Sequence, residues 1–281
     1  MRSKLFVPGS RPDLFPKALA SAADAISLDL EDAVAEADKV RARAAVSTFL
    51  RSEAARASSK QWIVRCNAPD SAHFEADVEA LLGSGLDQLN IPKLHGEAHL
   101  RETLKRLAAL EKRHGLAPAF GVLANVETPG ALIEAAGIAA ADTRICGLQL
   151  GLADLFEELG IARDDAANVH AVLFKLRLAA GRVGLPVIDG AFPHMDDLAG
   201  FEAEARMARR LGFAGKSCIH PRQIAIANSV FAPSMQELSW ARRVVEAAAG
   251  QAGVFVLDGR MIDRPFIKRA EQLLAEEENK S

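Results

Sequence analysis

Apolar, β-branched runs recur eight times along the chain, and stretches of helical periodicity separate them. In one such stretch Leu100, Leu104, Leu107 and Leu110 lie at helical spacing, and Gly115 follows where a helix would end. The stretches that read alike are residues 38–50, 73–82 and 196–213. A helix of roughly 10 to 15 residues between successive strands is the βαβ pattern. The sequence therefore predicts an α/β fold, a (β/α)8 TIM barrel over residues 1–220.

Most of the apolar runs end in a residue that can do chemistry. Closing parallel strands into a barrel brings their carboxyl ends to one rim, where distant residues face a common cavity. Polar groups at strand ends therefore indicate an enzyme. The residues at or near the predicted ends are Gly9, Glu31, Asp32, Arg65, Asn67, Lys93, Glu127, Asp154, Asp189 and His220.

Residues 221–281 fall outside the barrel cycle. A helical stretch over 233–250, the extended GVFVLDGR, the MIDRP segment and a last amphipathic helix follow one another there. We expect this C-terminal helical extension to dock on the chain's own rim or, as the more specific hypothesis, to pack on a neighbouring subunit. A purely structural cap is the alternative.

Composition and charge exclude several classes of protein. The 281 residues are 49% hydrophobic and 25% charged, as in ordinary soluble domains. A net charge of -3, spread over both signs, gives no case for nucleic acid or an anionic membrane as a partner. No run approaches the roughly 20 apolar residues of a membrane span. The three cysteines contain no CxxC pair, so we expect reduced thiols in a cytoplasmic protein.

Two carboxylates lie at neighbouring predicted strand ends. Glu127 stands in NVETPGAL and Asp154 in LGLADL, with no cluster of His or Cys beside them. Mg²⁺ is commonly held by one or two carboxylates that leave positions for water and substrate oxygens. The pattern favours a Mg²⁺ site, with capping of the following helices as the equally weighted alternative.

A third predicted strand end carries Arg65, in VRCN. An arginine there must face a carboxylate of the protein or of a ligand. Its planar fork suits a carboxylate substrate, and a salt bridge to Glu31 or Asp32 is an equal alternative compatible with it. Lys93 and Lys216 near other strand ends keep a Schiff-base aldolase open as a minor alternative. We expect His220 to fix a loop through backbone hydrogen bonds.

A series of motifs resembles the citrate lyase β-subunit-like proteins of the HpcH/HpaI aldolase/citrate lyase superfamily. The blocks run in order from Arg2 to Pro265: RSKLFVPGSRPDLFPKA, DAISLDLEDAV with KVRARAAV, VRCN, ETPGAL, LGLADL, GKSCIHPRQI and DGRMIDRP. The resemblance implies a (β/α)8 barrel with a C-terminal extension, assembled as a homotrimer or homohexamer. It implies Mg²⁺-dependent cleavage or formation of a C–C bond in a β-hydroxyacyl-CoA such as malyl-CoA or citramalyl-CoA. The partners would be an acyl-CoA thioester and a small 2-oxo acid.

The resemblance also implies residue roles. Glu127 and Asp154 match the metal ligands, and Arg65 and Glu127 match the contacts to the oxo acid. Asp263, in MIDRP, matches an acid that members donate into a neighbour's active site. The acids of LED, Glu31 and Asp32, match groups behind the metal that partner water or Arg65.

The sequence departs from the family near the expected pocket, at Gln149, Leu152 and His194. These departures leave the identity of the oxo acid open, while the reaction class stands.

Breaking the C–C bond leaves an enolate and a new carbonyl. In the expected mechanism Mg²⁺ acts as the Lewis acid, Arg65 stabilises the developing oxyanion, and Asp263 moves the proton at the enolate carbon. The alternatives are the β-type subunit of a citrate lyase complex acting on a carrier-bound thioester, a malyl-CoA thioesterase, and a non-enzymatic scaffold.

Overall fold

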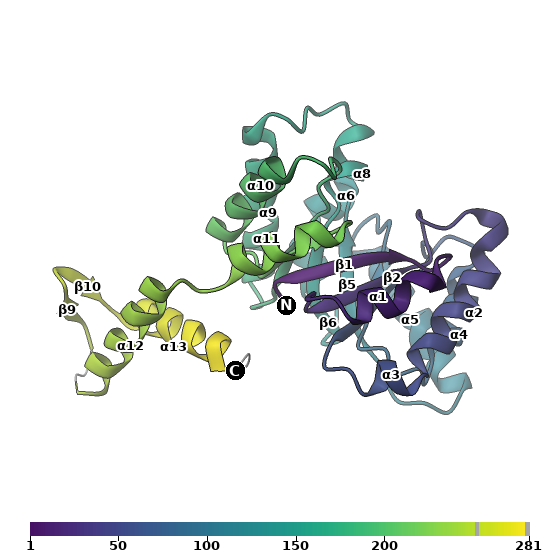
Figure 1. The fold of residues 1–281 in the computed structure, drawn as a ribbon, viewed down its shortest axis with the longest axis horizontal. Helices are drawn as coiled ribbons and strands as arrows, with labels where there is room; N and C mark the ends of the chain where they lie inside the picture. The colour runs from purple at the N-terminus through teal and green to yellow at the C-terminus, as the bar shows by residue number, and fades with distance from the viewer. Residues whose placement is uncertain (251–252, 279–281) are drawn as a thin grey trace. The chain divides into compact units, whose positions relative to one another are not determined.

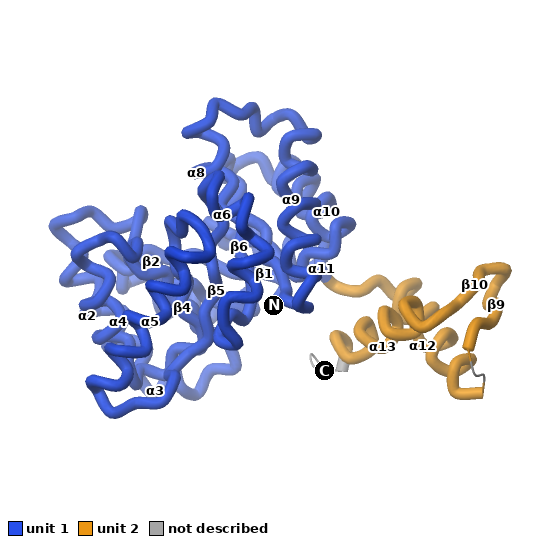
Figure 2. Tube along the Cα trace, turned by 180° about the vertical axis from the view of Figure 1, so that it is seen from behind, with its two compact units in different colours: residues 1–231 blue, residues 232–281 orange. Residues whose placement is uncertain are grey.

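The structure is a computed structural model that describes residues 1–250 and 253–278. The chain divides into two compact units, unit 1 over residues 1–231 and unit 2 over residues 232–281 (Figure 2). Within the described ranges no helix has the length and apolar character needed to cross a membrane.

Unit 1 is a closed barrel of eight parallel strands, which confirms the predicted fold class (Figure 1). Each strand pairs with the next along the chain, and β1 pairs with β8 to close the barrel. The strands are β1 Ser3–Pro8, β2 Ala25–Asp29, β3 Gln61–Arg65, β4 Gln88–Ile91, β5 Gly121–Val126, β6 Ile145–Leu150, β7 Val187–Asp189 and β8 Gly215–Cys218.

Helices follow the strands and cover the outside of the barrel (Figure 1). They are α1 Phe15–Leu19, α2 Lys39–Leu50, α3 Glu53–Arg56, α4 Phe74–Leu81, α5 Glu97–Arg113, α6 Pro129–Ile133, α7 Ala135–Ala139, α8 Leu152–Glu157, α9 Ala166–Gly181, α10 Leu198–Arg210 and α11 Pro221–Phe231, with the short 3-10 turns Pro12–Leu14 and Glu36–Asp38. The predicted ends hold for α5 and α10, because Gly115 and Gly212 follow them with φ of +68° and +83°.

The interior of the barrel is layered. At one level Ala25, Ile63 and Leu123 form a small apolar cluster, separate from the main core between sheet and helices. Polar side chains then fill the interior on the way to the carboxyl rim: Lys4, Ser27, Asn90, Asn125, Gln149 and Ser217, all buried. A barrel interior is ordinarily filled by bulky branched residues. This polar filling places hydrogen-bonding groups directly beneath the rim.

Unit 2 holds two helices and a hairpin. Helix α12 spans Met235–Ala249, strands β9 Phe255–Leu257 and β10 Arg260–Ile262 pair antiparallel, and α13 spans Arg264–Glu278. Its own small core comprises Ala241, Val244, Phe255, Ile262, Ala270 and Leu273. The expected boundary at residue 220 differs from the observed one, because α11 packs against β8 and β1 and so belongs to unit 1.

Candidate active site at the carboxyl rim of the barrel

The rim brings together five of the predicted site residues, Arg65, Glu127, Asp154, Glu31 and Asp32. Arg65 is the last residue of β3, and Glu127 directly follows β5. Asp154 was expected at the end of β6, but it lies beyond that strand, in the first turn of α8. The helix-capping alternative fails for Glu127, because the side chain of Thr128 caps α6 by accepting the amide of Ala131.

Arg65 contacts three acidic side chains. Its Nε and Nη2 atoms donate to the two oxygens of Asp29, each at 2.7 Å, in a bidentate pair. Its Nη1 atom lies 2.9 Å from Glu31 Oε2 and 3.5 Å from Asp32 Oδ2. The salt bridge to the LED acids is therefore present. The strongest partner, Asp29, was missed, although it stands opposite Arg65 in the parallel register of β2 and β3.

The pKa values of Asp29 and Glu31, two of the acids that contact Arg65, shift in opposite directions. For Asp29, burial works to raise the pKa, but the charge and hydrogen bonds of Arg65 outweigh it and hold the pKa below its ordinary value. For Glu31, burial dominates over the attraction of Arg65 and raises the pKa to about 8. Near neutral pH the pair Arg65–Asp29 is thus a fixed ion pair, whereas Glu31 is largely a neutral acid.

Glu127 is buried and held at both oxygens. Its Oε1 atom accepts the backbone N–H of Lys93 at 2.6 Å, and its Oε2 atom contacts the amide of Asn125. Gly151 makes room for it, since a Cβ there would lie 2.5 Å from the Cβ of Glu127. Burial raises the pKa of Glu127 to about 7, the Lys93 amide opposes the shift, and the charge of Asp154 adds to it. Glu127 and Asp154 therefore form an electrostatically linked pair of acids.

Lys93 links these acids. Its φ of +52° is rare for a residue with a side chain, and the backbone hydrogen bond to Glu127 helps to hold it there. Its ammonium contacts the carboxylate of Asp154 and lies 3.9 Å from Asp32 Oδ2. Burial would lower the pKa of Lys93, but Asp154 and Glu127 outweigh it and raise the pKa. A positive charge thus already lies between the rim acids.

A Schiff-base lysine is not supported by this geometry. Such a lysine must supply a neutral amine, but Lys93 is held charged by its acidic neighbours. Lys216 lies fully buried toward α10, with its Nζ atom 2.5 Å from Asp189 and 2.7 Å from Glu204. Those two acids outweigh burial and raise its pKa as well. The minor aldolase alternative therefore has no candidate nucleophile in these two lysines.

One buried lysine beneath the rim was missed. Lys4 has no solvent exposure, and its Nζ atom contacts Oε1 of Gln149, which also accepts from Asn90 at 3.1 Å. Burial, reinforced by the charge of Arg65, holds the pKa of Lys4 well below its ordinary value. Gln149, where the sequence departs from the family, thus contacts Lys4 of β1.

Comparisons with known proteins identify relatives of this chain. The profile of the HpcH/HpaI aldolase/citrate lyase family matches residues 2–221, the whole barrel up to the start of α11. The chain belongs to this family. A (3S)-malyl-CoA thioesterase from Cereibacter sphaeroides is 39% identical over 282 residues, covering 99% of this chain and 94% of the relative. The citrate lyase subunit beta of Escherichia coli is 36% identical over 283 residues, covering 99% and 93%.

Solved structures of family members carry ligands of the expected kind. The CitE protein of Mycobacterium tuberculosis, in complex with magnesium, acetoacetate and coenzyme A, matches with a TM-score of 0.77, 34% identity and 98% coverage of both chains. A citrate lyase beta subunit from the same organism, complexed with oxaloacetate and magnesium, matches with a TM-score of 0.68 and 34% identity over 83% of this chain and 97% of that one. The recognition of a citrate lyase β-subunit-like protein is therefore confirmed.

The remaining rim residues of this family member have local roles. The Nδ1 atom of His220 accepts the amide of Arg222 at 3.1 Å, so His220 fixes the start of α11 as expected. Asp189 accepts the amide of Gly190 at 2.8 Å and pairs with Lys216, on the outer side of the barrel. The three cysteines are free thiols, also as expected.

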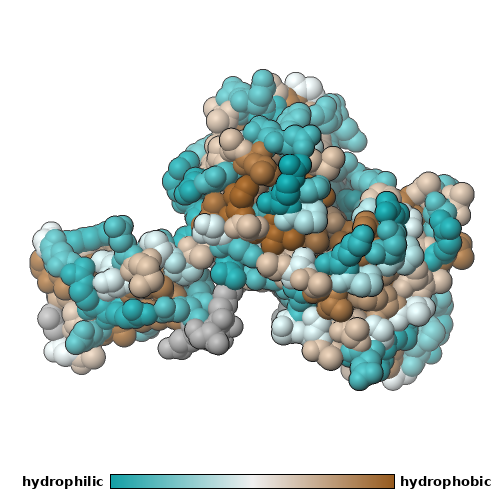
Figure 3. Space-filling model, viewed as in Figure 1, coloured by the Kyte–Doolittle hydropathy of each residue, from teal (hydrophilic) through white to brown (hydrophobic). Residues whose placement is uncertain are grey.

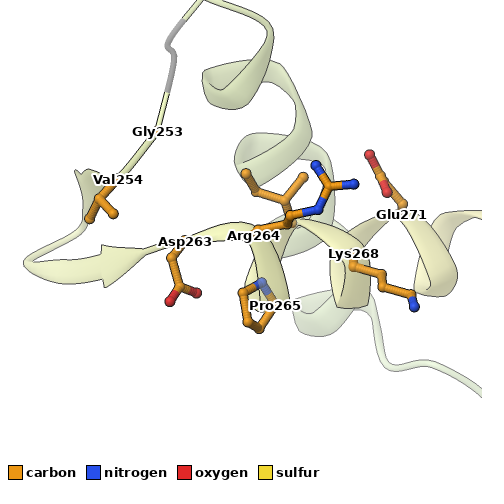
Figure 4. Close-up of a pocket in the computed structure, with 8 residues that line it drawn as sticks. Gly253, Val254, Asp263, Arg264, Pro265, Lys268 and Glu271 are labelled. Atoms are coloured by element: carbon orange, nitrogen blue, oxygen red, sulfur yellow. The ribbon is translucent and has the colours of Figure 1, made fainter.

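Asp263 belongs to unit 2. It lies between β10 and α13, and its Oδ1 atom is buried without a hydrogen-bond partner among residues 1–250 and 253–278. Its side chain lies beside a surface hollow of about 770 Å³ (Figure 4). The hollow is lined by Gly253, Val254, Asp263, Arg264, Pro265, Ile267, Lys268 and Glu271.

Proposed function

We propose that this family member is a Mg²⁺-dependent carbon–carbon lyase that cleaves or forms a β-hydroxyacyl-CoA such as malyl-CoA or citramalyl-CoA. The products of cleavage are acetyl-CoA and a 2-oxo acid. One observation carries the proposal. The buried acid Glu127 and the half-buried acid Asp154 interact electrostatically, and the ammonium of Lys93 lies beside them. All three belong to the same rim network as Arg65. Relatives with the same barrel bind magnesium, a 3-oxo or 2-oxo acid and coenzyme A.

The residues present fit a hard divalent ion. Oxygen donors alone, supplied by one or two carboxylates, are the set that Mg²⁺ prefers. The raised pKa of Glu127 reflects burial first and then the repulsion of Asp154, and a bound cation would relieve both. Glu127 and Asp154 would hold the ion, whose chemistry is to polarise the oxygens of the oxo acid.

Arg65 would bind the carboxylate of the oxo acid. Asp29 occupies its Nε and Nη2 atoms, which orients the guanidinium and leaves Nη1 as the donor toward the rim. Glu31 and Asp32 lie beside Nη1. Since burial raises the pKa of Glu31 to about 8, its neutral form competes weakly with a substrate carboxylate for Arg65 near pH 7.

Asp263 would protonate the enolate carbon on cleavage and take a proton from it on synthesis. We propose that it does so in the active site of a neighbouring subunit, in a homotrimer or homohexamer. Its Oδ1 atom is buried and accepts no hydrogen bond from the residues that the structure describes, which supports a role for this carboxylate in another subunit. Val254, Val256 and Met261 expose apolar surface on the same unit, which suits contact with another subunit. Figure 3 shows hydrophobic surface in brown among the hydrophilic surface of unit 2.

A thioesterase is the second candidate, because a malyl-CoA thioesterase is 39% identical over nearly the whole chain. In that reaction the same site would deliver water to the thioester carbonyl. A β-type subunit acting on a carrier-bound thioester is the third, because the citrate lyase β subunit is 36% identical.

Product analysis separates the three. The purified protein is incubated with Mg²⁺ and a panel of malyl-CoA, citramalyl-CoA and citryl-CoA, and the thioester, free thiol and acid are quantified together. A lyase gives acetyl-CoA and an oxo acid in equal amounts with no free thiol. A thioesterase gives free CoA and the intact hydroxy acid. Turnover only of carrier-bound thioesters selects the complex subunit, and inertness toward all of these substrates rejects the proposal.

A further inference from the structure

A second cluster of ligand-type side chains lies on the same rim, away from Glu127 and Asp154. Asp70 follows β3, His95 follows β4, and His99 lies in the first turns of α5. One ligand atom from each lies within 4.8 Å of the others. We propose that these three residues form a binding site for a zinc-class divalent cation, with one coordination position left open. This inference does not rest on the proposed function.

Two of the donor contacts are as short as those around such an ion, but they involve different oxygens of Asp70. The three ligand atoms lie within 4.8 Å of one another, so the donors must draw together when an ion binds. The Nε2 atom of His95 lies 3.3 Å from one oxygen of Asp70, and the Nε2 atom of His99 lies 3.4 Å from the other. Ligands about 2.0–2.1 Å from a tetrahedral zinc ion are separated from each other by roughly 3.3–3.4 Å. Two imidazoles and one carboxylate favour zinc, copper or nickel over the Mg²⁺ that we assign to the all-oxygen site.

The surroundings of the His99 ring also support the site. Its Nε2 atom is buried, faces Asp70, and makes no hydrogen bond to any residue that the structure describes. On the other side of the ring, Nδ1 accepts the amide of His95 at 3.2 Å, so the ring proton lies on Nε2. Ion binding at Nε2 would move that proton to Nδ1 and release the His95 amide. The site therefore forms through a local change at residues 95–96, and the stacked imidazole rings must turn toward the ion.

The loop that carries His95 is anchored from the neighbouring β5 loop. The hydroxyl of Thr128 donates to the carbonyl of Leu94 at 2.6 Å, and the amide of Glu97 donates to Glu134 at 2.7 Å. Gly130 approaches so closely that a Cβ there would lie 2.2 Å from the carbonyl oxygen of His95. This support limits the number of positions that the His95 side chain can reach.

The loop that carries Asp70 is tied to the same helix as His99. Arg106 of α5 donates to the carbonyl of Pro69 at 2.8 Å and pairs with Glu75 at 3.3 Å. The two loops are thus pre-positioned, which lowers the entropy lost when an ion joins them. An ion at this site would link the loop after β3 to the loop that carries Lys93, next to the candidate active site.

Zinc titration of tag-free, EDTA-treated, full-length protein tests the site. Calorimetry is carried out with excess Mg²⁺ present, so that the oxygen site does not take up zinc, and Co²⁺ absorption serves as a second probe of coordination. We expect one equivalent of Zn²⁺ to bind. The exposed variants His95→Ala and Asp70→Asn should each weaken binding at least about tenfold. Zn²⁺ should also raise the Tm of the wild-type protein but not of His95→Ala.

Two control variants keep the result specific. His114→Ala removes an exposed histidine from the other end of α5 and should bind zinc as the wild type does. Glu127→Gln removes a proposed Mg²⁺ ligand and should also leave zinc binding intact, which separates this inference from the proposed function. Absence of one-to-one binding, or unchanged affinity in both His95→Ala and Asp70→Asn, overturns the proposal.

Discussion

Lys93 and Asp154 form a charge pair on the carboxyl rim, and the backbone N–H of the same lysine donates to Glu127 at 2.6 Å. One residue in a left-handed conformation therefore contacts both proposed metal ligands. Its ammonium balances the acids when no divalent ion is bound, so that metal binding and the Lys93–Asp154 contact compete for the same carboxylate.

Replacing Lys93 tests this competition. Lys93→Met keeps the backbone amide but removes the ammonium, so we expect tighter Mg²⁺ binding and a lower Tm of the metal-free protein. Calorimetric titration with Mg²⁺ and thermal unfolding with and without the ion measure the two effects. Lys105→Met, on the exposed face of α5, is the control. Weaker Mg²⁺ binding in Lys93→Met would mean that the lysine supports the ion.

The two acids themselves should be required for turnover. EDTA should abolish activity and Mg²⁺ should restore it. Glu127→Gln and Asp154→Asn should each lower kcat by about 10²-fold or more, while circular dichroism shows a retained fold. Glu157→Gln, an exposed acid in the same helix as Asp154, should behave as the wild type. Full turnover in metal-free protein would rule out the proposed site.

The raised pKa of Glu31 predicts a dependence of stability on pH. Burial raises this pKa from 4.5 to about 8. Between these values the folded state binds more protons than the unfolded state, so the free energy of unfolding falls as pH rises. The contribution is complete below about pH 4.5 and is lost as pH rises through about 8. Denaturant unfolding of metal-free protein across this range should show the decline, and Glu31→Gln should reduce it. An identical slope in Glu31→Gln would contradict the assignment.

Stability and turnover should respond both to loss of the charge of Arg65 and to loss of its planar guanidinium. Arg65→Ala removes the cation that pairs with the buried Asp29, which keeps the backbone amides of Glu31 and Ala33, and should destabilise the protein by about 3–5 kcal/mol, as measured by denaturant unfolding. Arg65→Lys keeps the charge but cannot form the bidentate pair, so we expect no recovery of kcat. Near-native kinetics in Arg65→Lys would show that a positive charge at this position is enough and that the guanidinium is not needed to bind the oxo acid.

The sequence alone predicted the barrel well because apolar periodicity reports directly which face of a strand or helix is buried. It placed Arg65 and Glu127 correctly, since both lie at strand ends. It placed Asp154 at the end of a strand because the residues before it, LQLGLA, are mostly apolar, although the chain turns at Gly151 into α8. Local pattern could not show which side chains meet across strands, so Asp29 was overlooked.

The sequence also could not predict that Lys93 contacts both Glu127 and Asp154. These contacts depend on a left-handed backbone at Lys93, which the lysine residue type does not indicate. They also depend on a contact between the side chains of Lys93 and Asp154, which are 61 positions apart. The same limit applies to Lys4 and Gln149, which meet inside the barrel from its first and sixth strands.

Asp263 provides the test of a shared active site. Its carboxylate lies in unit 2 beside a hollow and has one buried oxygen without a hydrogen-bond partner, and Val256 and Met261 near it are exposed. If a neighbouring subunit receives this acid, activity depends on assembly. Asp263→Ala and Glu127→Ala chains should each be nearly inactive as pure oligomers. Mixed under conditions of subunit exchange, they should regain part of the activity, because some interfaces pair an intact metal site with an intact Asp263.

Asp258→Ala, a nearby acid that is exposed and paired with Arg243, is the matched control and should remain active without mixing. Exchange must be verified independently, for example by mass spectrometry of isotope-labelled chains. Verified exchange without any return of activity, or normal turnover by a monomer, would show that Asp263 does not act across subunits. In that case unit 2 contributes to assembly alone, and the proton at the enolate carbon must be moved by a residue of the barrel.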